Sequence, residues 1–444
     1  MKKYWQPDWA NDGPTQGTAS LVDMIRADGR HVVDAGQGAE LPLPDGELKN
    51  LLTQQTAVVL GGLYNTKTGG DRFVRESAAH YINSFYRIPV TRDNAFVYQG
   101  LGRAGVKLLL EKALAPHRNK NYQPILIMPD LHWPTLSEIA ADQGMKVVGY
   151  DHANPDLSAA VHDVFDVVNP AHVVAVLLNY PLNPTSRGID AAQMTEFMTA
   201  MDQINSAKGT NIHVILDMPY SYACSPGEDE KGRHLKTGAE HVFDKKWKTV
   251  VSGIISFSKF LSAAPIGTSI LFTFGDARDL SRRLSVGGLG IARNELYIRS
   301  LAKVIDGTHD ELLWAHNDAL RKKYVLNREA LEGAFGERVY PGMPNVLSLV
   351  TIPGDEVFGR TVMCCDGEKR VLKNGYDVVE YLANNHGIAV VANGVKDGNL
   401  LMRIAQREEY EAFGPGLKSL VAGLQEIRQA PVHKDERVLE AARG

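Results

Sequence analysis

Short apolar runs alternate with stretches of helical periodicity through the middle of the chain. Seven runs are apolar enough to form strands, at residues 95–99, 125–128, 146–150, 172–179, 213–218, 250–257 and 269–274. Several are β-branched and apolar on both faces, which is typical of buried, mostly parallel strands. Helical patterns lie between some of them, at 103–114, 134–143 and 191–207. This alternation predicts an α/β fold built on a mostly parallel seven-stranded sheet.

The pattern changes on both sides of this region. A helix over 71–86 is predicted to bury one apolar face, made of Phe73, Val74, Ala78, Tyr81, Ile82 and Phe85. A long helix over 311–335 leads into an α+β pattern, with strands at 346–352, 388–393 and 400–406 and helices at 377–387 and 417–429. Residues 1–30 lack clear periodicity, which suggests an arm. We expect a large domain over 55–310 and a small α+β domain over 311–444, completed by the N-terminal segment 1–54.

Composition narrows the classes of function. The 444 residues carry 48 basic and 52 acidic side chains, so the net charge of −4 gives no electrostatic footprint for nucleic acid. The three cysteines, Cys224, Cys364 and Cys365, have no metal-binding spacing and favour a reducing compartment. No apolar stretch marks a signal peptide or approaches the roughly 20 residues of a membrane helix. We expect a cytoplasmic protein with a small-molecule substrate, no metal, no membrane and no nucleic-acid partner.

The apolar run 250–257 is followed directly by Ser258 and Lys259. If the run is a strand, Lys259 lies just past its carboxyl end, where open α/β sheets bind their ligands. A lysine held there can have a lowered pKa, which makes its amine a candidate nucleophile for Schiff-base chemistry. Taken alone, a surface lysine after a strand is the simpler explanation, so the choice depends on the residues upstream.

A glycine-rich turn, GLGRAG at 100–105, follows the first strand and opens a helix. Free N–H groups and the helix dipole make such a turn an anion site. The spacing also matches the dinucleotide-binding fingerprint, and Asp130 follows the next strand, roughly where that fold keeps its ribose-binding acid. A nicotinamide-dependent dehydrogenase is therefore a competing interpretation. A tight turn with no ligand is also a common explanation of such glycines, so the motif by itself indicates only a phosphate group at this loop.

Three more strand ends carry residues suited to holding a flat ring. Trp133 follows the second strand and can stack on a ring face, although large aromatics usually pack for area alone. Asn183 lies between two prolines that hold its amide rigidly. Asp217 ends a strand and Tyr220 follows closely, so that a carboxylate and a phenol can bond a ring nitrogen and a ring oxygen. Each feature alone has an ordinary structural explanation.

Together, these motifs resemble the fold type I pyridoxal-phosphate enzymes, and most closely the class I and II aminotransferases. The glycine loop, the aromatic-proline pair, N-P-T, D-x-x-Y and S-x-S-K come in the family's order, and the resemblance covers nearly the whole chain, from about residue 30 to about residue 425. Their common order is more specific than any single motif. The resemblance also gives roles to Lys259, Asp217, Tyr220 and Asn183 at once, whereas the dehydrogenase interpretation uses none of them.

The resemblance implies a role for each residue around pyridoxal 5′-phosphate. Lys259 would hold the cofactor as an aldimine and move a proton through a quinonoid intermediate. Asp217 would keep the pyridine nitrogen protonated, which makes the ring an electron sink. Tyr220 and Asn183 would bond the ring oxygen, and Trp133 would stack on the ring. The phosphate would be cradled by loop amides and hydroxyls, at Gly100, Leu101, Gly102, Ser256 and Ser258.

The resemblance also implies how the substrate and a second subunit bind. Arg403 matches the arginine that forks onto the substrate α-carboxylate, a task suited to a bidentate guanidinium. Gly38 matches the glycine that lets this carboxylate approach, and Asn183 is a further candidate contact of the substrate. Tyr64 matches a tyrosine that reaches the phosphate of a neighbouring subunit, which implies a homodimer with shared active sites.

One departure from the family pattern bears on the chemistry. After Lys259 the family continues with a phosphate-binding arginine, which the stretch 260–267 lacks, and Arg103 beside the glycine loop is a candidate replacement. We expect an aminotransferase acting on an L-amino acid and a 2-oxo acid. The alternative is a pyridoxal-phosphate-dependent lyase or synthase that uses the same site for elimination, replacement or carbon–carbon bond formation. A cofactor-binding regulatory module is disfavoured, because no basic helix-turn-helix-like segment is visible.

Overall fold

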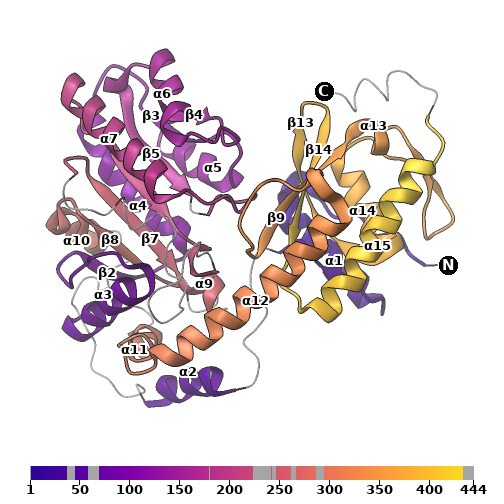
Figure 1. The fold of residues 1–444 in the computed structure, drawn as a ribbon, viewed down its shortest axis with the longest axis horizontal. Coiled ribbons are helices and arrows are strands. Elements are labelled where there is room, and N and C mark those ends of the chain that lie inside the picture. Colours follow the sequence, from indigo (N-terminus) through magenta and orange to yellow (C-terminus); the bar gives the residue numbers. More distant parts are fainter. Residues whose placement is uncertain are drawn as a thin grey trace. The chain divides into compact units, whose positions relative to one another are not determined.

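The computed structural model describes residues 2–37, 46–58, 70–179, 181–223, 242, 247–261, 267–286 and 295–433. The chain forms two compact units (Figure 1). The large unit comprises Pro42–Asn183 and Arg187–Ala319, and the small unit comprises Met1–Leu41, Pro184–Ser186 and Leu320–Gly444. Each unit contains its own sheet and its own apolar core.

The large unit is built on a seven-stranded sheet in the order β2-β8-β7-β6-β5-β3-β4, which confirms the predicted α/β fold (Figure 1). The strands β7, β6, β5, β3 and β4 run parallel, while β8 pairs antiparallel with both β2 and β7. Their bounds are β2 (Ala95–Gln99), β3 (Ile125–Pro129), β4 (Lys146–Tyr150), β5 (Val173–Asn179), β6 (His213–Asp217), β7 (Val251–Ser256) and β8 (Thr268–Thr273).

Helices surround this sheet and bury their apolar positions against it. α4 lies across β5, β6 and β7, and its residues Val106, Leu109 and Leu110, which recur at helical spacing, are fully buried in the core. The large-unit helices are α2 (Glu47–Val58), α3 (Arg72–Tyr86), α4 (Gly102–Leu114), α5 (Pro134–Asp142), α6 (Leu157–Val167), α7 (Ala191–Lys208), α9 (Phe257–Phe260), α10 (Ala277–Val286) and α11 (Glu295–Val304).

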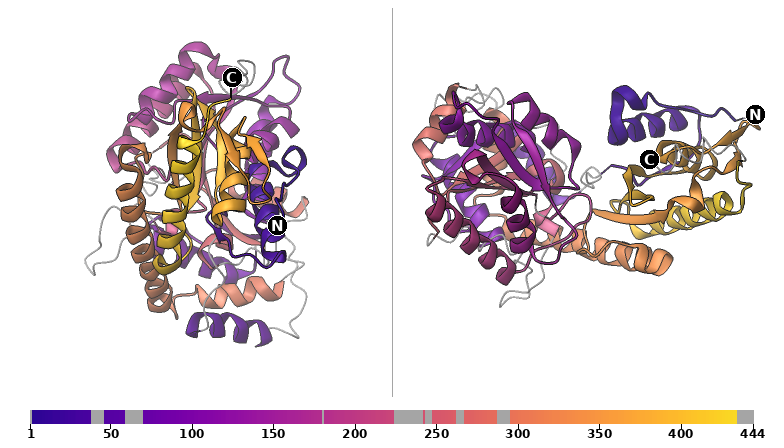
Figure 2. Two further views of the ribbon diagram at one scale, coloured as in Figure 1. Left: turned by 90° about the vertical axis from the view of Figure 1, so that its right-hand side faces the viewer. Right: turned by 90° about the horizontal axis from the view of Figure 1, so that it is seen from above.

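The small unit has a three-stranded antiparallel sheet in the order β13-β14-β9, a parallel pair β1-β12 and a hairpin β10-β11. Its helices α14 and α15 pack together (Figure 2). The strands are β1 (Val33–Asp34), β9 (Leu347–Pro353), β10 (Thr361–Met363), β11 (Lys369–Val371), β12 (Ile388–Ala389), β13 (Val391–Lys396) and β14 (Asn399–Ala405). The other helices of the small unit are α1 (Trp9–Ala27), α13 (Gly354–Val357), α14 (Gly375–His386) and α15 (Tyr410–Gln429). The long helix α12 (Asp310–Phe335) belongs to the large unit up to Ala319 and to the small unit from Leu320 onward.

The N-terminal segment differs from its sequence pattern, which predicts no helix. α1 spans Trp9–Ala27 and packs on α14, β12 and β13. Its sequence hides the periodicity because Gly13 and Pro14 kink the helix, with Gly13 at φ 67°. Gly17 interrupts it again, since a Cβ there would meet the ring of Trp9 at 2.4 Å. The glycine that lowers helix propensity is therefore the one that lets Trp9 pack.

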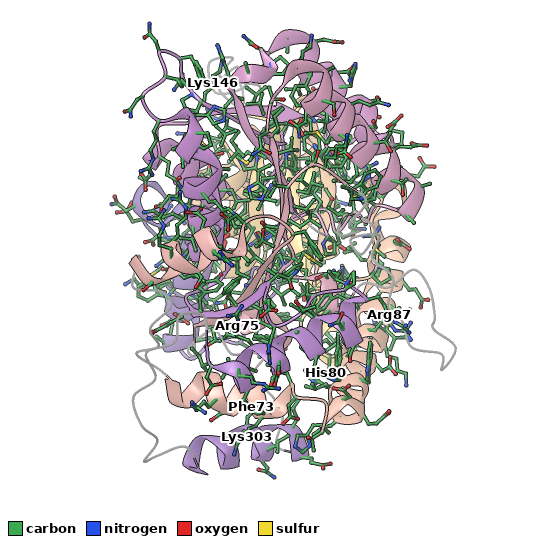
Figure 3. All side chains as sticks on the ribbon, turned by 90° about the vertical axis from the view of Figure 1, so that its left-hand side faces the viewer. Phe73, Arg75, His80, Arg87, Lys146 and Lys303 are labelled. Atoms are coloured by element: carbon green, nitrogen blue, oxygen red, sulfur yellow. The ribbon has the colours of Figure 1, made fainter. Side chains whose placement is uncertain are left out.

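Other helices also depart from the predicted pattern. α6, α10 and α11 are absent from the prediction, and α15 begins at Tyr410 rather than at 417. α3 buries most of its predicted apolar face, but Phe73, labelled in Figure 3, is 37% exposed. Within the part of the chain that the structure describes, no helix has both the length and the apolarity needed to cross a bilayer.

Candidate active site

Two polar side chains meet at the carboxyl ends of neighbouring strands in the large unit. β5 ends at Asn179 and β6 ends at Asp217, and the parallel register pairs these two residues. Asn179 Nδ2 donates to Asp217 Oδ2 at 3.0 Å, and both side chains are buried. A buried carboxylate needs hydrogen-bond donors to remain charged, and Asn179 supplies one. The strand ends therefore hold an acid in a fixed position at the sheet edge.

The environment of Asp217 is unusual for an aspartate. Burial raises the pKa of its carboxyl to about 7, although the Asn179 hydrogen bond and the nearby Lys259 charge both act to lower it. A carboxyl with a pKa this far above its ordinary range is a candidate for function. A cationic group brought against it would restore the charged form. This is the behaviour expected of the partner of a protonated ring nitrogen.

Asn179 links this acid to the proline-bounded loop that follows β5. Its Oδ1 accepts a hydrogen bond from the backbone N–H of Asn183 at 2.9 Å, while its Nδ2 bonds Asp217. Asn183 is itself buried. One amide thus positions both residues that the resemblance assigns to opposite sides of the cofactor ring. The sequence prediction missed Asn179; its only signal was a polar side chain ending an apolar strand.

Lys259 lies on the short helix α9, directly after β7, as the strand-end argument predicts. Its Nζ is 5.7 Å from the centroid of the Tyr220 ring, and its charge acts on Asp217. Ser256 caps α9, since its hydroxyl accepts from the N–H of Ser258 and lies 2.8 Å from the Ser258 hydroxyl. The structure therefore gathers the amine, the phenol, the acid and two hydroxyls in one region of the large unit.

The glycine loop is fixed by the neighbouring strand β8. The N–H of Gly100 donates to the carbonyl of Gly267, and the Ser269 hydroxyl donates to the carbonyl of Gly100 at 2.8 Å. Gly100 has φ 147°, and a Cβ there would meet Ala104 at 2.8 Å. The amide of Gly100 already bonds Gly267, and its contact with a phosphate stays a prediction. Leu101 and Gly102 carry the remaining amides of the loop.

Gly102 connects this loop with the acid and the capping serine. A Cβ at Gly102 would lie 3.6 Å from Asp217 Oδ1 and 3.8 Å from the Cβ of Ser256. The bare backbone of the loop therefore borders the same space as these side chains. Arg103 occupies the first turn of α4 and is exposed, and Trp133 precedes α5, half-buried against the large-unit core.

His132 has a structural explanation. Its Nδ1 lies 2.6 Å from the carbonyl of Pro129, and its Nε2 lies 2.5 Å from the hydroxyl of Ser137. Burial lowers the pKa of its imidazole. These contacts hold the turn that carries Trp133.

The predicted substrate residues belong to the small unit. Arg403 lies on β14 and is 4% exposed, and its Nη2 donates to the carbonyl of Gly36 at 2.9 Å and to the Thr15 hydroxyl at 3.1 Å. Gly38, predicted to border the substrate carboxylate, lies outside the described residues, as does Tyr64, predicted to reach a neighbouring subunit. The small unit therefore holds a buried arginine whose plane is fixed by two acceptors.

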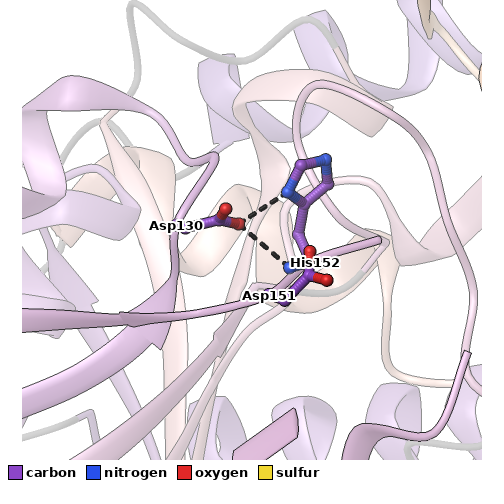
Figure 4. Close-up of side chains that lie close together, drawn as sticks. All are labelled: Asp130, Asp151 and His152. Carbon is purple, nitrogen blue, oxygen red and sulfur yellow. Dashed lines mark hydrogen bonds and ion pairs between the residues drawn. The ribbon is translucent and has the colours of Figure 1, made fainter. Parts of the chain in front are cut away.

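Asp130, the residue on which a dehydrogenase would depend, is engaged elsewhere. Its Oδ1 accepts from the N–H of Leu131, the N–H of His152 and His152 Nδ1, the last at 2.6 Å (Figure 4). Among the described residues, Asp130, Asp151 and His152 are the one group whose ligand atoms approach closely enough for a metal ion. The three hydrogen bonds to Oδ1 instead give Asp130 a structural role, which is to hold the loop after β4 in place.

Comparisons with known proteins agree with this arrangement. The aspartate aminotransferase from Rhizobium meliloti is 16% identical, with a TM-score of 0.70 over 92% of this chain and 95% of that one. An archaeal alanine:glyoxylate aminotransferase is 14% identical, with a TM-score of 0.72 over 93% and 95%. A probable N-succinyldiaminopimelate aminotransferase from Thermus thermophilus is 19% identical, with a TM-score of 0.65 over 93% and 99%. At these identities the likeness shows the fold alone.

The family follows from the sequence. A search of the curated proteins finds no match. The family model for aminotransferase class I and II matches residues 64–402, which include the glycine loop, Asn183, Asp217 and Lys259. The chain therefore belongs to the class I and II aminotransferases, which are transferases that depend on pyridoxal phosphate.

Proposed function

We propose that this chain transfers the amino group of an L-amino acid to a 2-oxo acid, and that it works as a cytoplasmic homodimer with shared active sites. The observation that carries the proposal is the buried Asp217, held by Asn179 and lying within reach of the Lys259 charge. An acid and an amine at adjacent strand ends are the two groups that amino-group chemistry on pyridoxal phosphate requires.

The residues of the large unit fit this cofactor. The space in front of Gly102, which a Cβ would fill, is bordered by Asp217 and Ser256. The donor set is complete: backbone amides and hydroxyls suit a phosphate, a carboxylate suits a protonated ring nitrogen, and a phenol suits a ring oxygen. Bound pyridoxal phosphate supplies a protonated ring that accepts the electron pair released when the substrate loses its α-proton.

The chain's own residues then have separate tasks. Asp217, in its charged form, holds the proton on the ring nitrogen, and Asn179 fixes the direction of its carboxylate. The Lys259 amine would hold the cofactor at its aldehyde carbon and, when free, would act as the base that takes up the substrate α-proton and gives it back. Tyr220, beside the Lys259 amine, orients the ring oxygen. Arg403 binds the α-carboxylate.

The product distinguishes this function from the alternative lyase or synthase. Holoenzyme is mixed with each common L-amino acid without an amino acceptor. An aminotransferase is expected to release one 2-oxo acid per cofactor and then stop until a 2-oxo acid is added. Continued turnover without an acceptor, with release of ammonia or of a side-chain fragment, would contradict transamination and support the alternative.

The phosphate site is proposed to depend on the hydrogen bonds that fix the glycine loop, with Arg103 as the candidate positive charge beside it. Ser269→Ala removes the hydroxyl that fixes the Gly100 carbonyl, and a lost buried hydrogen bond costs about 1 kcal/mol. We expect roughly fivefold weaker binding of pyridoxal phosphate to the cofactor-free protein, with unchanged binding of pyridoxal, which lacks the phosphate. Fluorescence titration measures both.

A matched control for this variant is Ser252→Ala. Ser252 is also a fully buried serine, but its hydroxyl bonds Thr273 and His213, away from the glycine loop. This variant is expected to lose stability without changing the ratio of the two affinities. An equal loss of pyridoxal and pyridoxal phosphate binding in Ser269→Ala would count against the phosphate assignment.

The carboxylate assignment of Arg403 is tested by Arg403→Ala. Loss of a charged hydrogen-bonding partner costs about 2 kcal/mol, so KM for the amino acid is expected to rise roughly thirtyfold. The affinity for pyridoxal phosphate is expected to stay within about twofold, because Arg403 lies on β14, outside the large unit. Steady-state kinetics and cofactor titration check both. An unchanged KM would show that another group binds the carboxylate.

A further inference from the structure

A second buried arginine lies four residues after Arg403 and has no part in the chemistry above. Arg407 is 8% exposed, and its Nη2 donates to Asp34 Oδ2 at 2.9 Å. Asp34 is fully buried. A buried ion pair adds little net stability, because desolvation of two charges offsets their attraction. The Arg407–Asp34 ion pair is therefore better explained by the positions in which it holds the neighbouring residues.

Asp34 organises the chain that follows β1. While one carboxylate oxygen bonds Arg407, the other accepts from the N–H of Gly36 at 3.0 Å and from that of Gln37 at 3.3 Å. Arg407 reinforces this turn, since its Nη1 donates to Gln37 Oε1 at 3.2 Å. The carbonyl of Ala35 also accepts from the N–H of Ala405. The turn is thus held by the Asp34 carboxylate and by a backbone hydrogen bond from β14.

This turn presents a carbonyl to Arg403. The Gly36 carbonyl accepts from Arg403 Nη2 at 2.9 Å, and the Thr15 hydroxyl accepts from the same nitrogen. Gly36 has no room for a side chain, because a Cβ there would lie 2.5 Å from Thr18 Cγ2. The order of contacts is therefore Arg407 to Asp34, Asp34 to Gly36, and Gly36 to Arg403.

We propose that Asp34 and Arg407 are positioning residues that fix the plane of the Arg403 guanidinium for the substrate α-carboxylate, a role that rests on the proposed function. A bidentate guanidinium is sensitive to its orientation, since both N–H groups must face the carboxylate together. Without the ion pair, the Asp34 side chain loses its fixed direction, the Gly36 carbonyl is held less firmly, and Arg403 tilts away from the productive angle. The effect falls on binding of the carboxylate and not on the cofactor.

The test uses holoenzyme and the common L-amino acid that the wild type converts fastest. Asp34→Asn keeps the acceptor for the two amides but removes the charge opposite Arg407. We expect KM to rise about tenfold, with kcat and the affinity for pyridoxal phosphate within about twofold. Arg407→Lys keeps the charge but loses the forked contact, and is expected to raise KM about threefold. It keeps the proposal testable if Asp34→Asn does not fold.

A double-mutant comparison separates positioning from a general structural role. If Asp34 acts through Arg403, then Asp34→Asn in an Arg403→Ala background has no further effect on KM. A second tenfold rise in that background would overturn the proposal, as would an unchanged KM in Asp34→Asn. The matched control is Glu356→Gln, which removes another small-unit carboxylate that pairs with Arg338 at 2.9 Å, and it is expected to leave KM unchanged.

The same experiment distinguishes failure of the inference from failure of the proposed function. A wild type that forms no 2-oxo acid from any amino acid would overturn the function, and this inference with it. A wild type that transaminates, together with variants whose KM is unchanged, would overturn the positioning role and leave the function standing.

Discussion

Replacing Lys259 by alanine is expected to give a folded protein that binds pyridoxal phosphate without a covalent bond and has lost about 10³-fold or more of its turnover. Lys259 supplies both the amine that binds the cofactor aldehyde and the base that moves the α-proton, and such a base alone contributes about 10²–10⁴-fold. It lies on α9 at the carboxyl end of β7, beside Tyr220 and within the field of Asp217. Steady-state assays and the visible absorption spectrum measure the two losses.

Chemical labelling identifies the lysine that binds the cofactor without relying on an activity assay. Borohydride treatment of the wild type fixes the cofactor on the amine that binds it, and peptide mapping is expected to find it at Lys259. The control is Lys146→Ala, which removes an exposed lysine at the start of the edge strand β4 and is expected to change neither spectrum nor turnover (Figure 3). A fixed cofactor at any other lysine would end the argument for Lys259.

Local pattern was sufficient to predict the large sheet. β5, β6, β7 and β8 are buried along their whole length, and each contains a run of apolar residues that contrasts with the helices between them. Their carboxyl ends follow from the strand boundaries, which is why the positions of Lys259 and Asp217 relative to β7 and β6 could be predicted. In contrast, α1 was not predicted, because Gly13, Pro14 and Gly17 have low helix propensity. Gly13 and Pro14 form a kink, and Gly17 leaves room for the Trp9 ring.

The finer features of the site depend on contacts between distant segments. Asn179 becomes recognisable only when the register of β5 against β6 sets it opposite Asp217. The amide of Gly100 is bonded by Gly267, and its carbonyl by Ser269, both from β8 or the residue before it. No spacing rule connects residues so far apart in sequence. The same holds for Asp34 and Arg407, which the parallel pairing of β1 with β12 and the position of β14 bring together.

Asp217→Asn is expected to lower the rate of α-proton exchange by about 10²–10⁴-fold while making the cofactor-free protein more stable at pH 8. The exchange rate falls because removing one partner of a buried ion pair costs about 3–5 kcal/mol, here the carboxylate that keeps the ring nitrogen protonated. Deuterium exchange at the substrate α-carbon, followed by NMR, measures it. A rate equal to that of the wild type would remove Asp217 from this role.

The gain in stability of the Asp217→Asn variant follows from the pKa of the Asp217 carboxyl, which burial raises to about 7. Between pH 4 and pH 7 the folded cofactor-free protein keeps a proton on Asp217 that the unfolded chain has lost. The wild type is therefore destabilised as the pH rises through this range, by up to about 4 kcal/mol. An amide at position 217 has no charge to desolvate, so urea unfolding curves of variant and wild type are expected to diverge toward pH 8 and converge near pH 4.

A carboxylate that is already well bonded is the proper control for this pH dependence. Asp202 accepts from the N–H groups of Lys248 and Thr249, so Asp202→Asn is expected to lose stability rather than gain it at pH 8. If Asp217→Asn also lost stability at pH 8, the carboxyl would not be strained by burial in the cofactor-free protein. Slower α-proton exchange in Asp217→Asn, together with a gain in stability that grows with pH, is instead expected if the buried Asp217 carboxylate is stabilised by a cation that binds beside it.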